Sequence, residues 1–581
     1  MEAISTWIMS NFQLKARLLW AMETGTGLHG PEKYLPYITL DRLITPTEVA
    51  KQIQKLDHRL PRATRQALVR HICRRSNVPR PDGAQALPYY LDTTCKRIFA
   101  ILILIDGVSL ELLFYLERKR VRDVDLLLPS NGRLGEGSVA AEFYRLLGLD
   151  RRTKFARCQW KVLAPIFQNR PGGEVPVYQF GPGTILPWTI HSKNSMLGTT
   201  SNVYLMKIDR RNRHLQFFTR EGTDLTEVAL KEFMDCIEEA AFDAEVTALK
   251  RFTSDDNPHI TELLAAFERD GRFYLICPLA QSNLTGLLQS TDPRQCADDK
   301  TLKRWIFAQC LGLATALSRI HVFKTADSQT GITKTEYGAH GDIKPENILW
   351  YNPPSSSSPN TTTTTPLPSG VLQICDFGQA AWLPSSSSSS SSSDNTPESL
   401  NGNGNDGEHL SAVYRAPEQY YPTRVARSQE SDVFALGCIF LGLAVWFVQG
   451  PEALARFAEE RRREREPVWV WDRVDGDRVF GHGDGVEDGG ERRKGRYFKF
   501  VADAAGREFV PVFKRVVVEK IEALRRQADC LAVWGLVSYV YENMLQLDDS
   551  RRPRCDWVVE VLRALLAGLD APEDRVAGED E

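Results

Sequence analysis

The sequence predicts an α+β protein in which a mostly helical region precedes short strands and then long helices. Apolar residues recur at helical spacing over most of residues 1–175. A stretch rich in Pro and Gly at 168–187 then marks a boundary or a loop-rich connection, and from about residue 190 short aliphatic and aromatic runs alternate with longer helical patterns. With 581 residues, 42% of them hydrophobic, the chain is long enough for two or more domains with their own cores.

The N-terminal region contains several segments of helical periodicity, at residues 16–22, 45–56, 63–75 and 97–128. Inside the last of these, the apolar run 98–105 is too short to cross a membrane and ends at Asp106, which favours a buried helix. We expect residues 1–175 to form a helical domain of unassigned role. The domain either docks against the strand-containing region that begins near residue 190 or recruits a protein partner.

In the second half, the sequence predicts strands at 202–209, 226–233 and 272–279 and helices at 237–252 and 302–323. The apolar run 433–448 has 16 residues, fewer than the ~18 that a membrane span needs, and it follows Asp432. We therefore expect a buried central helix there, and no membrane partner.

Three insertions interrupt this half. Segments 352–370 and 384–408 are dominated by Ser, Thr, Pro, Asn and Gly, so they bury too little apolar surface to offset chain entropy and are expected to be disordered. A third segment, about 450–510, is expected to be a disordered insertion as well. Its charged run 459–467 is predicted to be a solvated helix face. The tail 571–581 is acidic.

Composition narrows the possible partners and compartments. A formal net charge of −3 gives no general attraction to nucleic acid or to an anionic membrane, so phosphate binding must be local. The eleven cysteines are scattered and never form a CxxC pair, which is typical of reduced thiols. With no basic start followed by an apolar run at the N-terminus, we expect an intracellular, cytoplasmic protein, with the nucleus as a second possibility.

The residues that indicate a reaction begin in "HGDIKPENIL" at 340–349. Phosphoryl transfer requires groups that orient an acceptor hydroxyl, hold metal-bound phosphates and neutralise charge. Asp342 could orient the hydroxyl, Lys344 could neutralise the transferred group, and Asn347 could reach a metal ion. Downstream, "LQICDFGQA" is a short apolar strand that ends at Asp376, a second candidate for binding Mg²⁺.

Upstream, "VALK" places Lys231 on a strand, where its ammonium group could hold phosphates, and Glu245 in the next helix could pair with it. Further along, "SAVYRAPEQ" contains Glu418 and "LDDSRRPRC" contains Arg552. These two residues have the chemistry of a buried ion pair.

In this order, the motifs resemble a eukaryotic-type protein kinase domain over about residues 190–570. The resemblance implies a bilobal fold, with a small β-rich lobe and a large helical lobe, and ATP and Mg²⁺ as cofactors. It implies that Asp342 is the catalytic Asp, that Asn347 and Asp376 bind magnesium, and that Lys231 and Glu245 anchor ATP. More narrowly, the sequence resembles kinase-domain proteins of filamentous fungi that have a helical N-terminal region.

The nucleotide-binding part departs from that family's pattern. The three glycine positions of the phosphate-covering loop fall on Met196, Gly198 and Ser201, so only the middle glycine remains. Val203 would still cover the adenine. In "CPLAQ", Cys277 is expected to be the gatekeeper and Ala280 to read the base through its backbone, since a proline has no N–H to donate.

Three functions remain open at this point. Lys344, two residues after the catalytic Asp, is by resemblance the mark of a kinase that acts on Ser and Thr of protein substrates. A small-molecule phosphotransferase is the second, because its loop often reads "HGD". A pseudokinase that serves as a scaffold is the third, supported by the eroded glycine loop. Gly341 replaces the Arg that usually receives a phosphorylated activation loop, which makes this a non-RD sequence.

Overall fold

The structure is a computed structural model that describes residues 13–27, 30–74, 94–125, 138–181, 183–189, 192–194, 201–208, 214–234, 239–253, 257–295, 299–326, 333–351, 369–384, 413–420, 428–464, 469–474, 477–482, 495–502 and 509–570. The chain divides into two compact units. The first comprises Met1–Phe242 and Glu262–Leu279, and the second comprises Asp243–Thr261 and Ala280–Glu581. The low-complexity segments and the acidic tail lie almost wholly outside the described residues.

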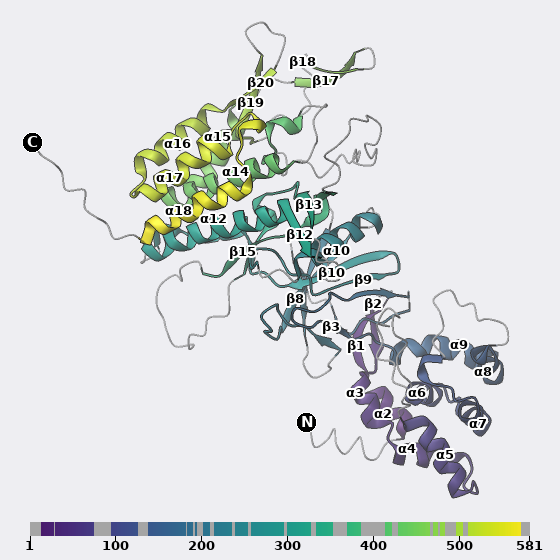
Figure 1. Ribbon diagram of the computed structural model, residues 1–581. Coiled ribbons are helices and arrows are strands. Elements are labelled where there is room, and N and C mark those ends of the chain that lie inside the picture. Colours follow the sequence, from purple (N-terminus) through teal and green to yellow (C-terminus); the bar gives the residue numbers. More distant parts are fainter. Residues whose placement is uncertain are drawn as a thin grey trace, which may run out of the picture. The chain divides into compact units, whose positions relative to one another are not determined.

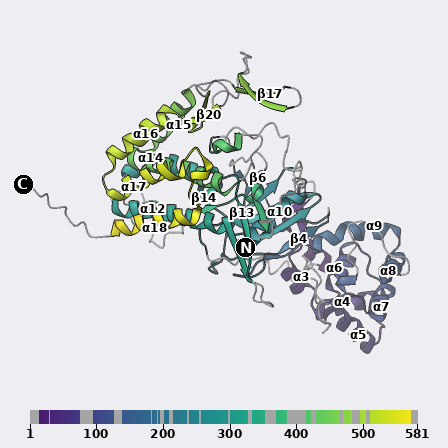
Figure 2. The ribbon, with the colours of Figure 1, turned by 45° about the horizontal axis from the view of Figure 1, so that its top comes forward.

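The first unit begins with a group of helices around one apolar core (Figure 2). They are α2 (Leu14–Trp20), α3 (Tyr37–Leu43), α4 (Pro46–Leu56), α5 (Arg62–Cys73), α6 (Lys96–Leu104), α7 (Leu110–Arg118), α8 (Val139–Leu147) and α9 (Leu149–Cys158). Thr45 caps α4 by accepting the Glu48 N–H, and Ser109 caps α7 by accepting the Leu112 N–H. The predicted helices are confirmed, except that 97–128 is split between α6 and α7, where Asp106 has a φ of 53°.

A six-stranded sheet forms the rest of the first unit, in the order β4-β9-β10-β8-β6-β5. Its strands are β4 (Val177–Phe180), β5 (Ser192–Asn194), β6 (Ser201–Lys207), β8 (Glu227–Phe233), β9 (Ala265–Arg269) and β10 (Arg272–Pro278). The three predicted strands are thus confirmed as β6, β8 and β10. Strand β9 was not predicted, and the shorter pair β3 (Phe167–Gln168) and β7 (Leu215–Gln216) adds to the same core.

The N-terminal helical region is joined to this sheet, in contrast to the predicted boundary at 175–190. Strand β4 lies inside the Pro/Gly-rich stretch and pairs in parallel with β9. A hairpin of β1 (Glu23–Gly27) and β2 (Gly30–Tyr34) reaches the same segment, because Thr26 exchanges backbone hydrogen bonds of 2.9 and 3.0 Å with Leu186. The boundary was misplaced because Phe167 and Phe180 share one buried core with Phe267 of β9.

The second unit is mainly helical and is built around α12 (Asp299–His321) and α14 (Gln429–Gln449) (Figure 1). Around them lie α11 (Leu284–Ser290), α15 (Pro451–Arg463), α16 (Arg515–Gln527), α17 (Leu531–Tyr539) and α18 (Cys555–Asp570), and α10 (Glu239–Thr253) enters this unit at Asp243. Helix α14 is long and apolar enough to cross a membrane, yet 83% of its most apolar window is buried inside the protein. This burial agrees with the predicted central core helix.

Two three-stranded sheets in the second unit frame the loop that begins at His340. One has the order β11-β14-β15, formed by Ser282–Asn283, Ile348–Tyr351 and Val371–Ile374. The other has the order β12-β13-β16, formed by Val322–Ala326, Thr333–Ala339 and Ala381–Pro384. The helix predicted to reach residue 323 ends at His321, because Val322 and Phe323 pair with β13 instead.

The prediction that 450–510 is a disordered insertion is wrong for most of its described residues. Helix α15 covers Pro451–Arg463 and buries Phe457. Strands β17 (Trp469–Val474) and β18 (Asp477–His482) form one hairpin, and β19 (Phe498–Ala502) pairs with β20 (Phe509–Phe513). The apolar residues scattered among the charges supply this packing, which composition alone concealed.

Candidate active site

The loop between β13 and β14 brings together the predicted catalytic residues Asp342 and Lys344 and the predicted metal residue Asn347. Lys344 Nζ donates to Asp342 Oδ2 over 2.6 Å. Asn347 Nδ2 donates to both the backbone oxygen and Oδ2 of Asp342, each over 2.9 Å. A single carboxylate oxygen, Asp342 Oδ2, therefore takes hydrogen bonds from a cation and an amide.

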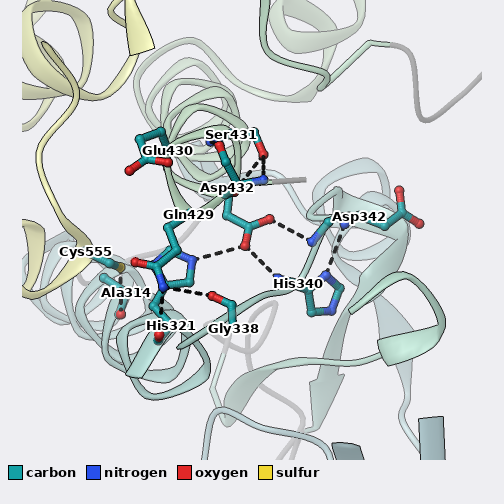
Figure 3. A network of polar contacts seen from close by, with 12 residues as sticks. Ala314, His321, Gly338, His340, Asp342, Gln429, Glu430, Ser431, Asp432 and Cys555 are labelled. Carbon is teal, nitrogen blue, oxygen red and sulfur yellow. Dashed lines mark hydrogen bonds and ion pairs between the residues drawn. The ribbon is translucent and has the colours of Figure 1, made fainter. Parts of the chain in front are cut away.

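A buried carboxylate on α14 holds the backbone of this loop (Figure 3). Asp432 Oδ2 accepts the His340 N–H over 2.7 Å, and Oδ1 accepts the Gly341 N–H over 2.9 Å. His321 Nε2 donates to the same carboxylate over 3.1 Å. Both His340 and Asp432 are buried. Because a buried donor without a partner costs about 1–3 kcal/mol, this network defines one loop conformation.

Asp432 is a functional residue to which sequence reasoning assigned no role. Its signal was present, since an acidic side chain at the head of a long apolar helix must find partners when it is buried. Ser428 caps that helix by accepting the Ser431 N–H, which places Asp432 in the first turn. Gln429 completes the arrangement by donating to the carbonyl oxygens of His321 and Gly338 over 2.7 and 3.0 Å.

Gly341 adopts a backbone conformation that favours glycine. Its φ is +79°, in the left-handed region. A residue with a Cβ atom costs roughly 1–2 kcal/mol more there. Glycine at position 341 therefore avoids this cost and places no charged side chain in the loop.

The second predicted metal residue, Asp376, lies two residues after the end of strand β15. The preceding Cys375 donates its N–H to Asn347 O over 2.9 Å, which links the two candidate metal-binding segments. Asp376 itself has a φ of +67° and a ψ of +77°. Phe377 is buried, with its ring centroid 5.1 Å from that of His340 and 5.7 Å from that of Phe252.

Glu245 of α10 is buried and lies on the same side of this turn as Asp376. A Cβ atom placed on Gly378 would be 3.4 Å from Glu245 Oε2 and 3.5 Å from Asp376 Oδ1. The carboxylates of Glu245 and Asp376 therefore lie near the same backbone position.

Asn347 and Asp376 have the right chemistry for Mg²⁺. Both bonds that Asn347 makes to Asp342 use the amide nitrogen, which leaves the carboxamide oxygen for a cation. Mg²⁺ prefers oxygen ligands and usually takes only one or two from side chains, with phosphates and water completing the shell. In the described part of the chain, no group of three or more His, Cys, Asp or Glu forms a separate metal cluster.

In the first unit, strand register gathers the candidate nucleotide-binding residues on one face of the sheet. Lys231 pairs directly with Val203 of β6 and with Leu275 of β10. The next row pairs Ala229 with Leu205 and with Cys277. Alternate residues of β8, such as Val228 and Leu230, are buried on the opposite face.

This face also contains Ala229, to which the sequence analysis assigned no role. Ala229 is half-buried between Leu205 and Cys277, on the same face as Val203. Gly198 and Met196 lie outside the described residues. Lys231 belongs to the first unit and Glu245 to the second, so their ion pair stays a prediction.

Ala280 follows β10 at the start of the second unit and is half-buried. The next residue, Gln281, donates its N–H to Trp350 O of β14 over 3.0 Å. This bond ties the segment after Ala280 to the strand that follows the loop of Asp342, Lys344 and Asn347.

The predicted ion pair between Glu418 and Arg552 is present and buried. Arg552 donates from its two terminal nitrogens to the two carboxylate oxygens over 2.6 and 2.8 Å. It also donates to the backbone oxygens of Glu430 and Gln546 over 3.1 and 2.7 Å. The guanidinium group therefore joins the segment that contains Glu418 to α14 and to the turn before α18.

Residues 220–450 match the family model of the protein kinase domain. The chain contains a protein kinase domain. It is 27% identical over 214 residues to cyclin-dependent kinase-like 5 of Mus musculus and to the Homo sapiens protein of the same name. The match covers 36% of this chain but only 17% of either relative. The six-stranded sheet of the first unit and the helical second unit fit the bilobal α+β fold that the resemblance implied.

Proposed function

We propose that this kinase domain transfers the γ-phosphoryl group of ATP to Ser and Thr hydroxyl groups of proteins. The observation that carries this proposal is the pair of hydrogen bonds from Lys344 and Asn347 to the Asp342 carboxylate. A carboxylate restrained in this way presents a defined oxygen to an acceptor hydroxyl, and a cation lies beside the position of the transferred group.

The other site residues take roles that agree with their positions. Asn347 and Asp376 would hold Mg²⁺, which supplies charge neutralisation between the phosphates. Val203, Ala229 and Cys277 would contact the adenine, and the backbone at Ala280 would read its edge. Lys231 would bind the phosphates, with Glu245 fixing its ammonium group.

We also propose that activity does not depend on a phosphate docking at residue 341. Gly341 has no side chain to receive one. The start of the activation segment is instead held by strand pairing of β16 with β13. Arg251 supports this pairing, because its guanidinium group lies 4.4 Å from the Trp382 ring centroid and forms an ion pair with Glu336.

The test is a phosphorylation assay with purified full-length protein, Mg-ATP and both protein and small-molecule acceptors. Wild type should be stabilised thermally by Mg-ATP and should label Ser and Thr of protein acceptors, whereas Asp342→Asn should bind nucleotide and label nothing. Phosphatase pretreatment should leave the activity intact. Label on small molecules alone would favour the phosphotransferase, and activity restored only by phosphorylation of the activation segment would contradict the proposed control.

A second candidate is a pseudokinase that acts as a scaffold. It is favoured by Met196 and Ser201 at two of the three glycine positions, because glycine lets the backbone approach phosphate closely. Absence of both Mg-ATP stabilisation and labelling in wild type would support this function over catalysis.

A further inference from the structure

Strand β19, in the connection between α15 and α16, is anchored to the helical core of the second unit. Tyr497, just before the strand, donates its hydroxyl to Cys438 O of α14 over 3.1 Å. Its carbonyl accepts the Lys514 N–H over 3.1 Å. Lys499 pairs with Glu464 at the end of α15 over 2.9 Å. Tyr497 and Phe498 are buried, so this strand is a fixed part of the domain.

The same strand contacts the segment that contains Glu418 from both sides of that residue. Tyr414 lies four residues before Glu418, and its ring centroid is 6.4 Å from that of Tyr497. Tyr420 lies two residues after it, with its ring centroid 6.0 Å from those of both Phe498 and Phe500. Tyr497 and the aromatic residues of β19 therefore pack against residues 414–420, and the ion pair between Glu418 and Arg552 holds the same segment.

A buried arginine reinforces the contact with Tyr414. The Arg461 guanidinium lies 3.9 Å from the Tyr497 ring centroid and 4.5 Å from that of Phe457. Arg461 is only 5% exposed, and its backbone oxygen accepts the Lys514 ammonium group over 2.8 Å. A desolvated cation over an aromatic face is attracted by the ring quadrupole, which favours one orientation of the Tyr497 ring.

The segment that contains Tyr414 is also joined to the loop of Asp342 through the first turn of α14, because Arg552, the ion-pair partner of Glu418, donates to Glu430 O and Asp432 accepts the Gly341 N–H. Burial raises the pKa of the Tyr414 hydroxyl, Arg461 acts in the opposite direction, and the Glu346 carboxylate raises it further. Glu346 lies between Lys344 and Asn347 in the loop, and its Oε1 accepts the Thr285 hydroxyl over 3.1 Å. Tyr414 thus lies within electrostatic range of both the β19 anchor and the loop that carries Asp342.

We propose that Tyr497, Phe498 and Arg461 are positioning residues for the protein acceptor. They fix Tyr414 and Tyr420, and through them the surface beside the catalytic loop against which a polypeptide must lie to bring its hydroxyl to Asp342. This inference rests on the proposed function and adds to it how the acceptor is bound. ATP binding uses the sheet of the first unit and does not involve these residues.

The experiment compares Tyr497→Leu with Tyr497→Phe, which keeps the ring and loses only the hydroxyl. Val510→Ala on the partner strand β20, 41% exposed, is the control within the same hairpin. Dephosphorylated casein and myelin basic protein serve as acceptors. Tyr497→Leu should raise the acceptor KM about tenfold and leave the ATP KM and the slow hydrolysis of ATP by water within about twofold, whereas the other two variants should resemble wild type.

A second measurement does not depend on activity. Backbone amide hydrogen exchange at residues 414–420 should become at least about tenfold faster in Tyr497→Leu, while residues 433–445 of α14 stay protected. Unchanged exchange at 414–420, or equal losses in the ATP and acceptor parameters, would overturn the inference. If wild type labels neither protein, the proposed function fails, and the exchange result alone then decides whether β19 positions this segment.

Discussion

The loop that contains Asp342 and the sheet that contains Lys231 obtain their geometry in different ways. The loop is fixed by directional hydrogen bonds. Asp432 accepts two backbone N–H groups, and Asp342 accepts hydrogen bonds from the side chains of Lys344 and Asn347. The sheet presents Lys231 beside Val203 only through strand register and an apolar core on its other face. Single polar substitutions should therefore abolish transfer, whereas changes in the sheet should alter nucleotide affinity by degrees.

The largest effect is expected on the free energy of unfolding, at the buried ion pair between Glu418 and Arg552. Glu418→Ala leaves the Arg552 cation without its carboxylate, so the domain should lose about 3–5 kcal/mol of unfolding free energy. Urea denaturation measures this loss. The double variant with Arg552→Met should recover part of the loss, since neither charge then remains buried alone. Equal loss in the single and double variants would show that the ion pair is not what braces the segment.

Asp432→Ala tests the loop directly. It leaves the His340 and Gly341 N–H groups unpaired, and a displacement of about 1 Å at Asp342 lowers the transfer rate about 100-fold. The ATP KM should change less than about threefold, because the sheet is untouched. Glu430→Ala, two residues away on the same helix, is the matched control and should keep full kcat. A parallel rise in the ATP KM would break the distinction between the two regions.

The first unit should respond to pH through His214, which joins the N-terminal helices to the sheet. His214 Nδ1 donates to Pro165 O over 2.8 Å, and Nε2 accepts the Tyr37 N–H over 3.1 Å. Burial, aided by Arg97, lowers its pKa from 6.5 to about 4. The contribution of neutral His214 to the stability of the folded state is thus complete above pH 6.5 and is lost as the pH falls towards 4.

Two other buried groups of the first unit, His71 and Asp123, change the stability of the folded state in opposite directions as the pH falls. Burial lowers the pKa of His71 to about 4, so protonation of His71 also destabilises the folded state as the pH falls. Burial raises the pKa of Asp123 to about 6, so protonation of Asp123 stabilises the folded state as the pH falls. Thermal unfolding from pH 7 to pH 5 should therefore show a net loss of stability. His214→Asn should reduce this loss by about 2 kcal/mol. A variant with the same pH profile as wild type would contradict the role of His214.

The smallest effect is expected from restoring a glycine at the nucleotide face. Ser201→Gly should lower the ATP KM about two- to fivefold and leave kcat unchanged, because glycine allows closer approach of the backbone to phosphate. Steady-state kinetics at saturating acceptor measures both constants. A change in kcat instead of KM would mean that this position affects the catalytic loop.

Local patterns predicted much of this protein. The buried helix α14, the strands β6, β8 and β10, and the grouping of Asp342, Lys344 and Asn347 all follow from short-range periodicity or motif spacing. The hairpin β19–β20 could not be predicted in this way, because its anchors on α14 and α15 lie far away in the sequence. Strand β4 was missed for the same reason, since its partner β9 is almost 90 residues further along.

The sequence by itself determined which chemical groups are present and in which helices, strands or loops they occur, since these depend on neighbouring residues. Only the tertiary structure decided that Asp432 binds the backbone at Gly341, 91 residues earlier, and that Ala229 shares a face with Val203 and Lys231. It also decided that Tyr497 supports Tyr414. Long-range hydrogen bonds and strand register depend on how distant segments pack, which no local pattern records.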